Sequence, residues 1–256
     1  MLAFLLLTLS VASTSELVIP RNDVDVHVVE YLADMYTVVT VHFGGDTDIR
    51  LYGGKTGGSN FAEAHAAIIT AGRKPIALMN GGMSDSDHRA VGLLVTNGEI
   101  HHQLIVINGA GSFYLKPNGA FWLDTAGRAH VTTTDNFLMD RYLGSMLRRP
   151  NPVVWATQSG PMLHVGDYLH PEFKPESTNW LIRNAVGTSD GGYTVRLVIS
   201  HEPVRFYDLA TLFRDQLGCD NAMLLDEGVS RLWTTGTDLP AGHYASVIAV
   251  TRALEP

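Results

Sequence analysis

The sequence has a single cysteine, Cys219, among its 256 residues. One cysteine excludes an intrachain disulfide and a zinc site built from several thiolates. The residues on either side of Cys219 carry no positive charge that would stabilise a thiolate. We therefore interpret Cys219 as a small buried core residue and not as a nucleophile.

Positive charge is also scarce, since lysine and arginine total 18 against 26 acidic residues and the formal net charge is −8. No run of basic residues is longer than two. This balance lacks the basic face that nucleic-acid-binding proteins present, so we expect no nucleic-acid partner. Hydrophobic residues make up 45% of the chain, which is enough for an ordered core.

Several catalytic signatures are missing. The sequence contains no H-E-x-x-H pair, and the glycine-rich run at 55–59 lacks the order of a P-loop. These absences disfavour a zinc peptidase and a nucleotide-binding protein. Histidines are numerous but lack the spacing of zinc ligands, as at His101, His102, His164 and His170.

Residues 1–12 read MLAFLLLTLSVA and contain no charged residue. The stretch is too short to span a bilayer and resembles the hydrophobic region of a secretory signal, with Ala12 placed for cleavage, although no basic residue precedes it. We expect a signal peptide at 1–12, one domain over 13–256, a secreted or periplasmic location and no membrane span. A first buried strand and a mis-set start codon are the alternatives.

Short β-branched or alternating runs, separated by turn residues, predict many strands. They lie at 24–29, 36–43, 49–52, 76–79, 90–95, 100–107, 113–116, 120–123, 153–157, 162–165, 193–200, 222–225 and 246–251. Asn97-Gly98 and Asn118-Gly119 predict hairpin turns. Helices are expected from the N-cap Asn60 to about residue 72, at 134–147 and at 206–217. Strands dominate without regular β-α alternation, so we predict a single α+β domain with a largely antiparallel or mixed β-sheet core and two or three helices.

Four separated segments have the composition of a polar site. Three of them follow apolar runs, and all combine small residues with one to three polar side chains. Glycine at a strand end lets a ligand approach the backbone closely. The segments are Asn80-Gly81-Gly82, Gln158-Ser159-Gly160-Pro161, residues 183–187 (RNAVG) and residues 225–230 (LDEGVS).

In this order the segments resemble the motifs of the phosphodiester glycosidase family, over roughly two-thirds of the chain from residue 76 onward. The similarity is to its short exported bacterial members. A strand ending at His201 follows the third motif, as in the family. The fourth motif departs from the pattern, because Glu227 stands where the family usually has glycine. This carboxylate either raises the pKa of Asp226 by repulsion or points away from the site.

The resemblance implies hydrolysis of a sugar-1-phosphate diester, which frees the sugar and leaves a phosphomonoester. The anomeric carbon passes through an oxocarbenium-like state that a carboxylate stabilises, and Asp226 is the candidate. Arg183 would neutralise the phosphate with its planar guanidinium, unless it forms an ordinary ion pair. His201 is the candidate acid or base, or else a half-exposed strand histidine.

The remaining candidates would bind substrate. Asn80 either hydrogen-bonds a sugar hydroxyl or phosphate oxygen or caps its own turn. The backbone N–H groups of glycines form an anion-binding nest or serve only tight turns. Serine hydroxyls lie in the same motifs. The set expected to bind substrate is Asn80, Gly81, Gly82, Ser159, Gly160 and Ser230.

We expect a sugar-phosphate or phosphoglycan as the partner and no cofactor or bound metal. A Ca²⁺ or Mg²⁺ ion on Asp85 and Asp87 is the exception to consider, against a solvated loop. Two alternative functions stay open. One is a non-catalytic phosphoglycan-binding protein, motivated by Glu227, and the other is a metal-dependent phosphodiesterase that uses Asp85, Asp87 and nearby histidines.

Overall fold

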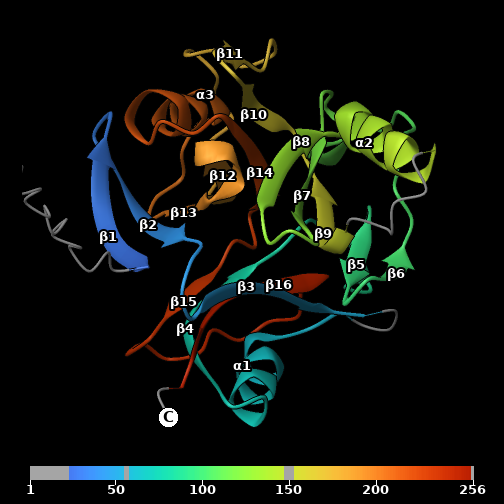
Figure 1. The fold of residues 1–256 in the computed structure, drawn as a ribbon. Coiled ribbons are helices and arrows are strands. Elements are labelled where there is room, and N and C mark those ends of the chain that lie inside the picture. The colour runs from blue at the N-terminus through green and yellow to red at the C-terminus, as the bar shows by residue number, and fades with distance from the viewer. Residues whose placement is uncertain (1–22, 55–57, 147–152, 255–256) are drawn as a thin grey trace, which may run out of the picture.

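The computed structural model describes residues 23–54, 58–146 and 153–254 (Figure 1). The leader expected at 1–12 lies outside these ranges, as does part of the loop at 55–59. In the described part of the chain, three β-sheets with antiparallel strand pairs are accompanied by three α-helices. This confirms the predicted single α+β domain with a largely antiparallel sheet core.

The largest sheet has seven strands in the order β1-β2-β13-β12-β14-β10-β11. Its strands are β1 (Val24–Tyr31), β2 (Asp34–His42), β13 (Thr194–Ser200), β12 (Arg183–Ser189), β14 (Asn221–Glu227), β10 (Met162–Val165) and β11 (Tyr168–Leu169). The four-stranded sheet contains β15 (Leu232–Thr234), β4 (Arg73–Asn80), β16 (Ser246–Ala253) and β3 (Thr47–Gly53). The five-stranded sheet contains β6 (Glu99–His102), β5 (Leu94–Thr96), β9 (Val153–Ser159), β7 (Gly119–Asp124) and β8 (Ala129–Thr133).

The three sheets enclose one shared hydrophobic core. Each sheet contributes inward-facing side chains to this core. Examples are Leu197 from the seven-stranded sheet, Ile248 from the four-stranded sheet and Phe121 from the five-stranded sheet. Trp155 joins two of the sheets directly, because its indole N–H donates to the Ile49 carbonyl over 2.9 Å. Strands from distant parts of the sequence therefore end close together.

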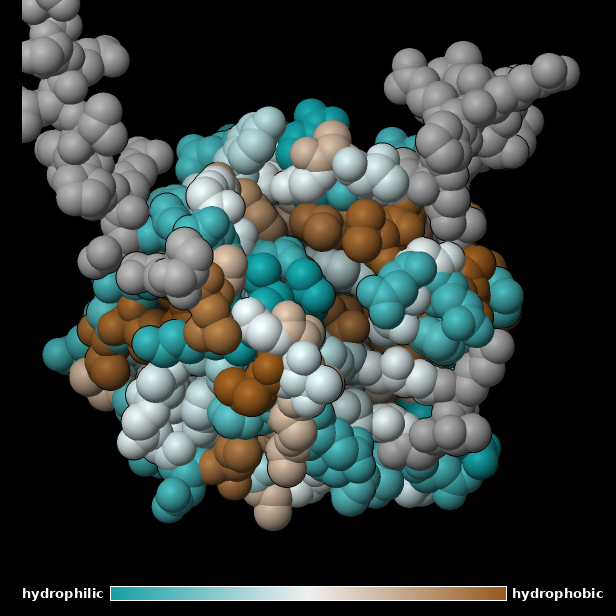
Figure 2. Space-filling model, turned by 60° about the horizontal axis from the view of Figure 1, so that its bottom comes forward, coloured by the Kyte–Doolittle hydropathy of each residue, from teal (hydrophilic) through white to brown (hydrophobic). Residues whose placement is uncertain are grey.

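A helix covers the outer face of each sheet (Figure 1). α1 (Phe61–Thr70) packs Phe61 and Ile68 on the four-stranded sheet, and Asn60 caps it by accepting from the Glu63 amide. α2 (Thr134–Met146) packs Phe137 on the five-stranded sheet. α3 (Phe206–Thr211), continued by a π-helical turn at Leu212–Gln216, packs Leu209 on the seven-stranded sheet. None of the helices in the described ranges has the length and apolarity needed to cross a membrane. Hydrophilic and hydrophobic residues are interspersed over the face drawn in Figure 2.

Several local predictions were wrong. Residues 113–116 contain a short 3₁₀ helix at Ser112–Tyr114 in place of a strand, and the strand expected at 100–107 ends at His102. Asn97-Gly98 does form the β5–β6 hairpin turn, with both φ angles positive. Asn118-Gly119 does not, because Asn118 is buried and accepts from the Thr134 hydroxyl. A polar side chain that finds a tertiary partner overrides the local turn preference.

Candidate functional site

The candidate site lies where strands of all three sheets end. Asn80 is the last residue of β4, Ser159 the last of β9, and Asp226 the next-to-last of β14. The Asn80 amide Nδ2 donates to Asp226 Oδ2 over 3.0 Å, and the Ser159 hydroxyl donates to the Leu225 carbonyl over 2.7 Å. The fold thus brings together three of the predicted site residues, which are separated by up to 146 positions in sequence.

A buried hydrogen-bond network fixes the orientation of Asn80. Its Oδ1 accepts from Asn184 Nδ2 over 3.2 Å and from the Arg231 backbone N–H over 2.8 Å. The Ser230 hydroxyl donates to Asn184 Oδ1 over 3.0 Å, which fixes that amide in turn. Because Asn80 accepts both of these hydrogen bonds with its Oδ1 atom, its Nδ2 group must face Asp226. Asn80 and Ser230 therefore position the carboxylate.

Asp226 is itself re-aimed by a β-bulge. Asn184 pairs with Asp226 and Ala185 with Leu224, so Leu225 is the additional residue in β14. A bulge turns the following side chain relative to the regular alternation. The carboxylate of Asp226 accepts from Asn80 and from the Glu227 backbone N–H over 2.8 Å.

The electrostatic setting of Asp226 is unusual for a carboxyl group. Burial raises the pKa of Asp226 to about 7. The hydrogen bond from the Glu227 backbone opposes the shift, whereas the Glu227 charge adds to it. At neutral pH the group therefore exists in both protonation states, which suits proton transfer or attack at a reacting carbon.

Asp226 lies in the wall of an open pocket with a volume of about 580 Å³. Carboxylates, an arginine, imidazoles and hydroxyls line the pocket, together with apolar surface. Its size is in the range of small-ligand sites in proteins. The lining residues are Ser84, Asp85, Ser86, His88, Asp226, Glu227, Val229, Arg231, Ala241, Gly242, His243 and Tyr244.

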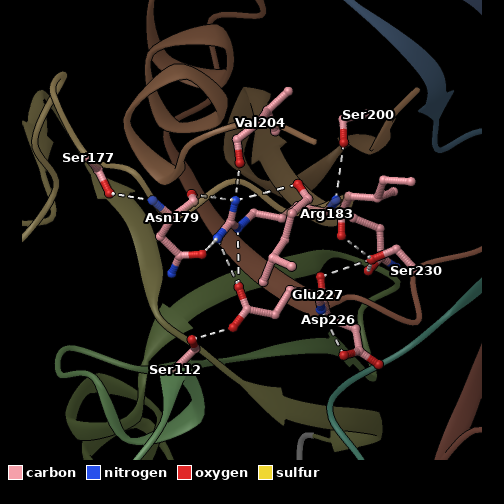
Figure 3. Close-up of polar contacts among 12 residues, drawn as sticks. Ser112, Ser177, Asn179, Arg183, Ser200, Val204, Asp226, Glu227 and Ser230 are labelled. Atoms are coloured by element: carbon pink, nitrogen blue, oxygen red, sulfur yellow. Dashed lines mark hydrogen bonds and ion pairs between the residues drawn. The ribbon is translucent and has the colours of Figure 1, made fainter. Parts of the chain in front are cut away.

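Arg183 and Glu227 form an ion pair beside this pocket (Figure 3). The Arg183 guanidinium is fully buried, and its Nη2 lies 3.1 Å from Glu227 Oε2. Other donors of Arg183 go to Asn179 and to the Val204 carbonyl, and the guanidinium stacks on Phe206 at 4.0 Å. Glu227 is therefore the counter-ion of a buried cation. A phosphate-binding role for Arg183 stays a prediction, and its donors already have partners within the protein.

His201 is not brought to Asp226. Its Nε2 lies 2.8 Å from the Thr37 hydroxyl, and it lines a separate pocket of about 480 Å³. Ser230 and Arg231 of the β14–β15 loop also line that second pocket, and Arg231 is common to both. An acid or base role for His201 stays a prediction, and a substrate would have to extend across this loop to reach both residues.

The motif glycines lie in closely packed backbone. The Gly81 N–H donates to the Ser246 carbonyl over 2.9 Å, and the Gly82 N–H donates to the Thr157 hydroxyl over 3.1 Å. A Cβ on Gly82 would lie 2.4 Å from the Gln158 carbonyl oxygen, and one on Gly160 2.5 Å from Asn118 Cβ. These contacts explain the need for glycine through packing. An anion-binding nest stays a prediction, and at Gly81 and Gly82 the donors are already used.

The Asp85 loop is organised by its own backbone. Asp85 Oδ1 accepts from the Asp87 and Arg89 N–H groups, each over 2.9 Å, and these bonds lower the pKa of Asp85. Across the described ranges, no three histidine, cysteine, aspartate or glutamate side chains gather closely enough to hold a metal ion. The loop accordingly supplies no ligand set for the metal-dependent alternative.

The sequence did not single out Arg231, His88, His243 or Asn184 as site residues. Asn184 and Arg231 lie within or next to the recognised motifs, so their position was the available signal. His88 belongs to the Asp85 loop, which the sequence suggests only as a metal site, and His243 belongs to a loop without any motif. Only the packing of the loops at 84–90 and 241–244 brings them to the pocket of Asp226.

Comparisons with known proteins agree with this arrangement. Residues 73–249, more than half of the chain, match the family described as phosphodiester glycosidase. The chain is 27% identical over 206 residues to the uncharacterized protein YigE of Escherichia coli strain K12, covering 79% of this chain and 76% of YigE.

The fold is similar to that of a solved structure, the zebrafish N-acetylglucosamine-1-phosphodiester alpha-N-acetylglucosaminidase catalytic domain auto-inhibited by pro-peptide. The TM-score is 0.57 at 16% identity, with 89% of this chain and 81% of that chain covered. The family match includes the strands that carry Asn80, Ser159, Arg183 and Asp226. The chain therefore belongs to the phosphodiester glycosidase family and is a hydrolase of that type.

Proposed function

We propose that this protein hydrolyses a sugar-1-phosphate diester at the anomeric C–O bond, outside the cytoplasm. The observation that carries the proposal is the placement of Asp226, which is held by Asn80 in the wall of a polar pocket beside Arg231. The name of the zebrafish neighbour, which specifies a 1-phosphodiester of N-acetylglucosamine, supports the substrate class. The composition of residues 1–12 supports export.

In this mechanism a water molecule supplies the new oxygen on the sugar. The bond between the anomeric carbon and the bridging oxygen breaks, and the phosphomonoester leaves with that oxygen. Asp226 in its carboxylate form stabilises the positive charge that develops on the sugar ring, either as nucleophile or as base for water. Because a phosphomonoester leaves more readily than a sugar alkoxide, charge neutralisation matters more than protonation of the leaving group.

The proposal is tested with synthetic glycosyl 1-(methyl phosphate) diesters of several sugars, glucose and N-acetylglucosamine among them. We expect equal amounts of reducing sugar and methyl phosphate, followed by ³¹P NMR. The variant Asp226→Asn should reduce turnover by about 10³-fold or more while keeping its fold. Formation of methanol and sugar 1-phosphate would instead show P–O cleavage and reject the proposed reaction.

A further inference from the structure

The phosphate group of the substrate needs a cation whose donors are free to bind it. Arg183 does not offer one, because its side chain is fully buried and its guanidinium bonds to Glu227, Asn179 and the Val204 carbonyl. Breaking the ion pair would leave the buried Arg183 cation without a counter-ion, which is strongly unfavourable. Arg183 is also absent from the lining of the pocket that contains Asp226. The cation for the substrate has to come from elsewhere.

Arg231 meets this requirement. It is exposed, it lines the pocket together with Asp226, and it forms no ion pair with a carboxylate of the described residues. One guanidinium nitrogen, Nη1, donates to the Ser230 carbonyl over 2.7 Å, which leaves Nε and Nη2 free to donate. Its backbone N–H donates to Asn80 Oδ1, the same side chain that orients Asp226.

The charges of Arg231 and Asp226 act on the same neighbour. Burial raises the pKa of the Tyr244 hydroxyl, while Arg231 opposes that shift and Asp226 adds to it. Both charged groups therefore lie within electrostatic range of one tyrosine in the pocket wall. A phosphate bound by Arg231 would lie close to a sugar that faces Asp226.

Two imidazoles stand on another wall of the same pocket. The rings of His88 and His243 lie 5.6 Å apart with an angle of 34° between their planes. Asn60 caps α1 with its Oδ1, so its Nδ2 faces His243 Nε2 at 3.4 Å. Nε2 of His243 is then the acceptor and Nδ1 carries the proton. In this tautomer, Nδ1 of His243 can donate a hydrogen bond to a phosphate oxygen.

The loop that carries His88 is fixed before any ligand binds. Asp85 accepts from the Asp87 and Arg89 N–H groups, and the His88 N–H donates to the Asp85 carbonyl over 3.1 Å. His88 itself has a φ of 61°, a left-handed conformation that the surrounding bonds hold in place. The Asp85 carboxylate also lines the pocket, and its Oδ1 is occupied by the two backbone donors.

We propose that Arg231, together with His88 and His243, binds the nonbridging oxygens of the substrate phosphate. The inference deepens the proposed function and rests on it for the identity of the substrate. It assigns the preference for an anionic diester to the β14–β15 loop and to the loops around 88 and 243. Arg183 keeps a structural role as the partner of Glu227.

The kinetic test compares Arg231→Gln with Arg50→Gln, a half-buried arginine paired with Asp48 outside this pocket. With a glycosyl 1-(methyl phosphate) diester, Arg231→Gln should raise KM by roughly 10- to 100-fold, as expected for loss of a charge-assisted bond to phosphate. Inorganic phosphate should inhibit this variant more weakly by a similar factor, whereas Arg50→Gln should match wild type. Equal KM and equal inhibition in the two variants would overturn the assignment.

A binding test separates this inference from the proposed reaction. Inorganic phosphate is titrated into wild-type protein while the imidazole signals of His88 and His243, assigned by His→Gln variants, are followed by NMR. Saturable shifts that vanish in Arg231→Gln support the subsite even if no diester is cleaved, in which case only the proposed reaction fails. Turnover of a diester by a protein whose imidazole signals do not respond would reject the subsite and leave the reaction standing.

Discussion

The substitution Asp226→Asn is expected to stabilise the protein at alkaline pH while it removes activity. The side chain keeps its size and one oxygen, which can accept from either Asn80 or the Glu227 backbone, whereas the two carboxylate oxygens of Asp226 accept one bond each. What it loses is a negative charge that is 7% exposed to solvent. Residues placed for function are often unfavourable for stability, and a buried carboxylate is a direct case.

The magnitude follows from the pKa of Asp226, which burial raises from 3.8 to about 7. Between these values the folded protein holds a proton that the unfolded chain has released, so stability falls as pH rises from about 4 to about 7. The full gap corresponds to about 4 kcal/mol. In the variant, the NH₂ group of the new asparagine faces a hydrogen-bond donor, which costs part of this free energy. We therefore expect the variant to be more stable than wild type by about 2–4 kcal/mol above pH 7.

The assay is urea unfolding of wild type and Asp226→Asn at about pH 4, 6 and 8. The contributions of all other titrating groups cancel in the difference between the two proteins. The difference should be small or negative at pH 4 and should grow in favour of the variant up to pH 8. Asp46→Asn, at an exposed position whose side chain is outside the site, serves as the control. A difference that does not change with pH would refute the reasoning.

Three further predictions concern the same region. Glu227→Gln should lower the free energy of unfolding by about 2–3 kcal/mol in urea titrations, because it leaves the buried Arg183 cation without a counter-ion, and an unchanged stability would contradict the ion pair. Gly82→Ala should cost about 1–3 kcal/mol in thermal unfolding, since its Cβ would approach two atoms of β9, whereas Gly54→Ala has open space and should cost less. The pH profile of kcat should rise through an apparent pKa near 7 as Asp226 ionises, and a profile flat between pH 5 and 8 would exclude the carboxylate as the active form.

The strand-rich pattern of the sequence was sufficient to predict the fold class. The polar motifs marked Asn80, Ser159 and Ser230, which lie together near Asp226 because β4, β9 and β14 end close to one another. The periodicity of the sequence predicts which segments are strands. The family resemblance predicts that the motifs at the ends of these strands lie in one site. Catalytic roles at these positions stay predictions that the experiments above address.

The parts that could not be predicted depend on tertiary pairing. Arg183 looks in the sequence like a phosphate ligand, but the register of β12 against β14 places it opposite Glu227. The bulge at Leu225, which aims Asp226, has no sequence signal, since alternation alone would place that side chain differently. Arg231 and His243 become site residues only through loop packing, and loops carry no periodic pattern from which their contacts can be read.

Hydrolysis in H₂¹⁸O tests the central claim most directly. A glycosyl 1-(methyl phosphate) diester is incubated with wild-type protein, and both products are analysed at once by mass spectrometry, before the sugar exchanges its anomeric oxygen with solvent. Attack at the anomeric carbon predicts ¹⁸O in the sugar and none in methyl phosphate, with the reaction lost in Asp226→Asn. Incorporation of ¹⁸O into the phosphate product would contradict the account.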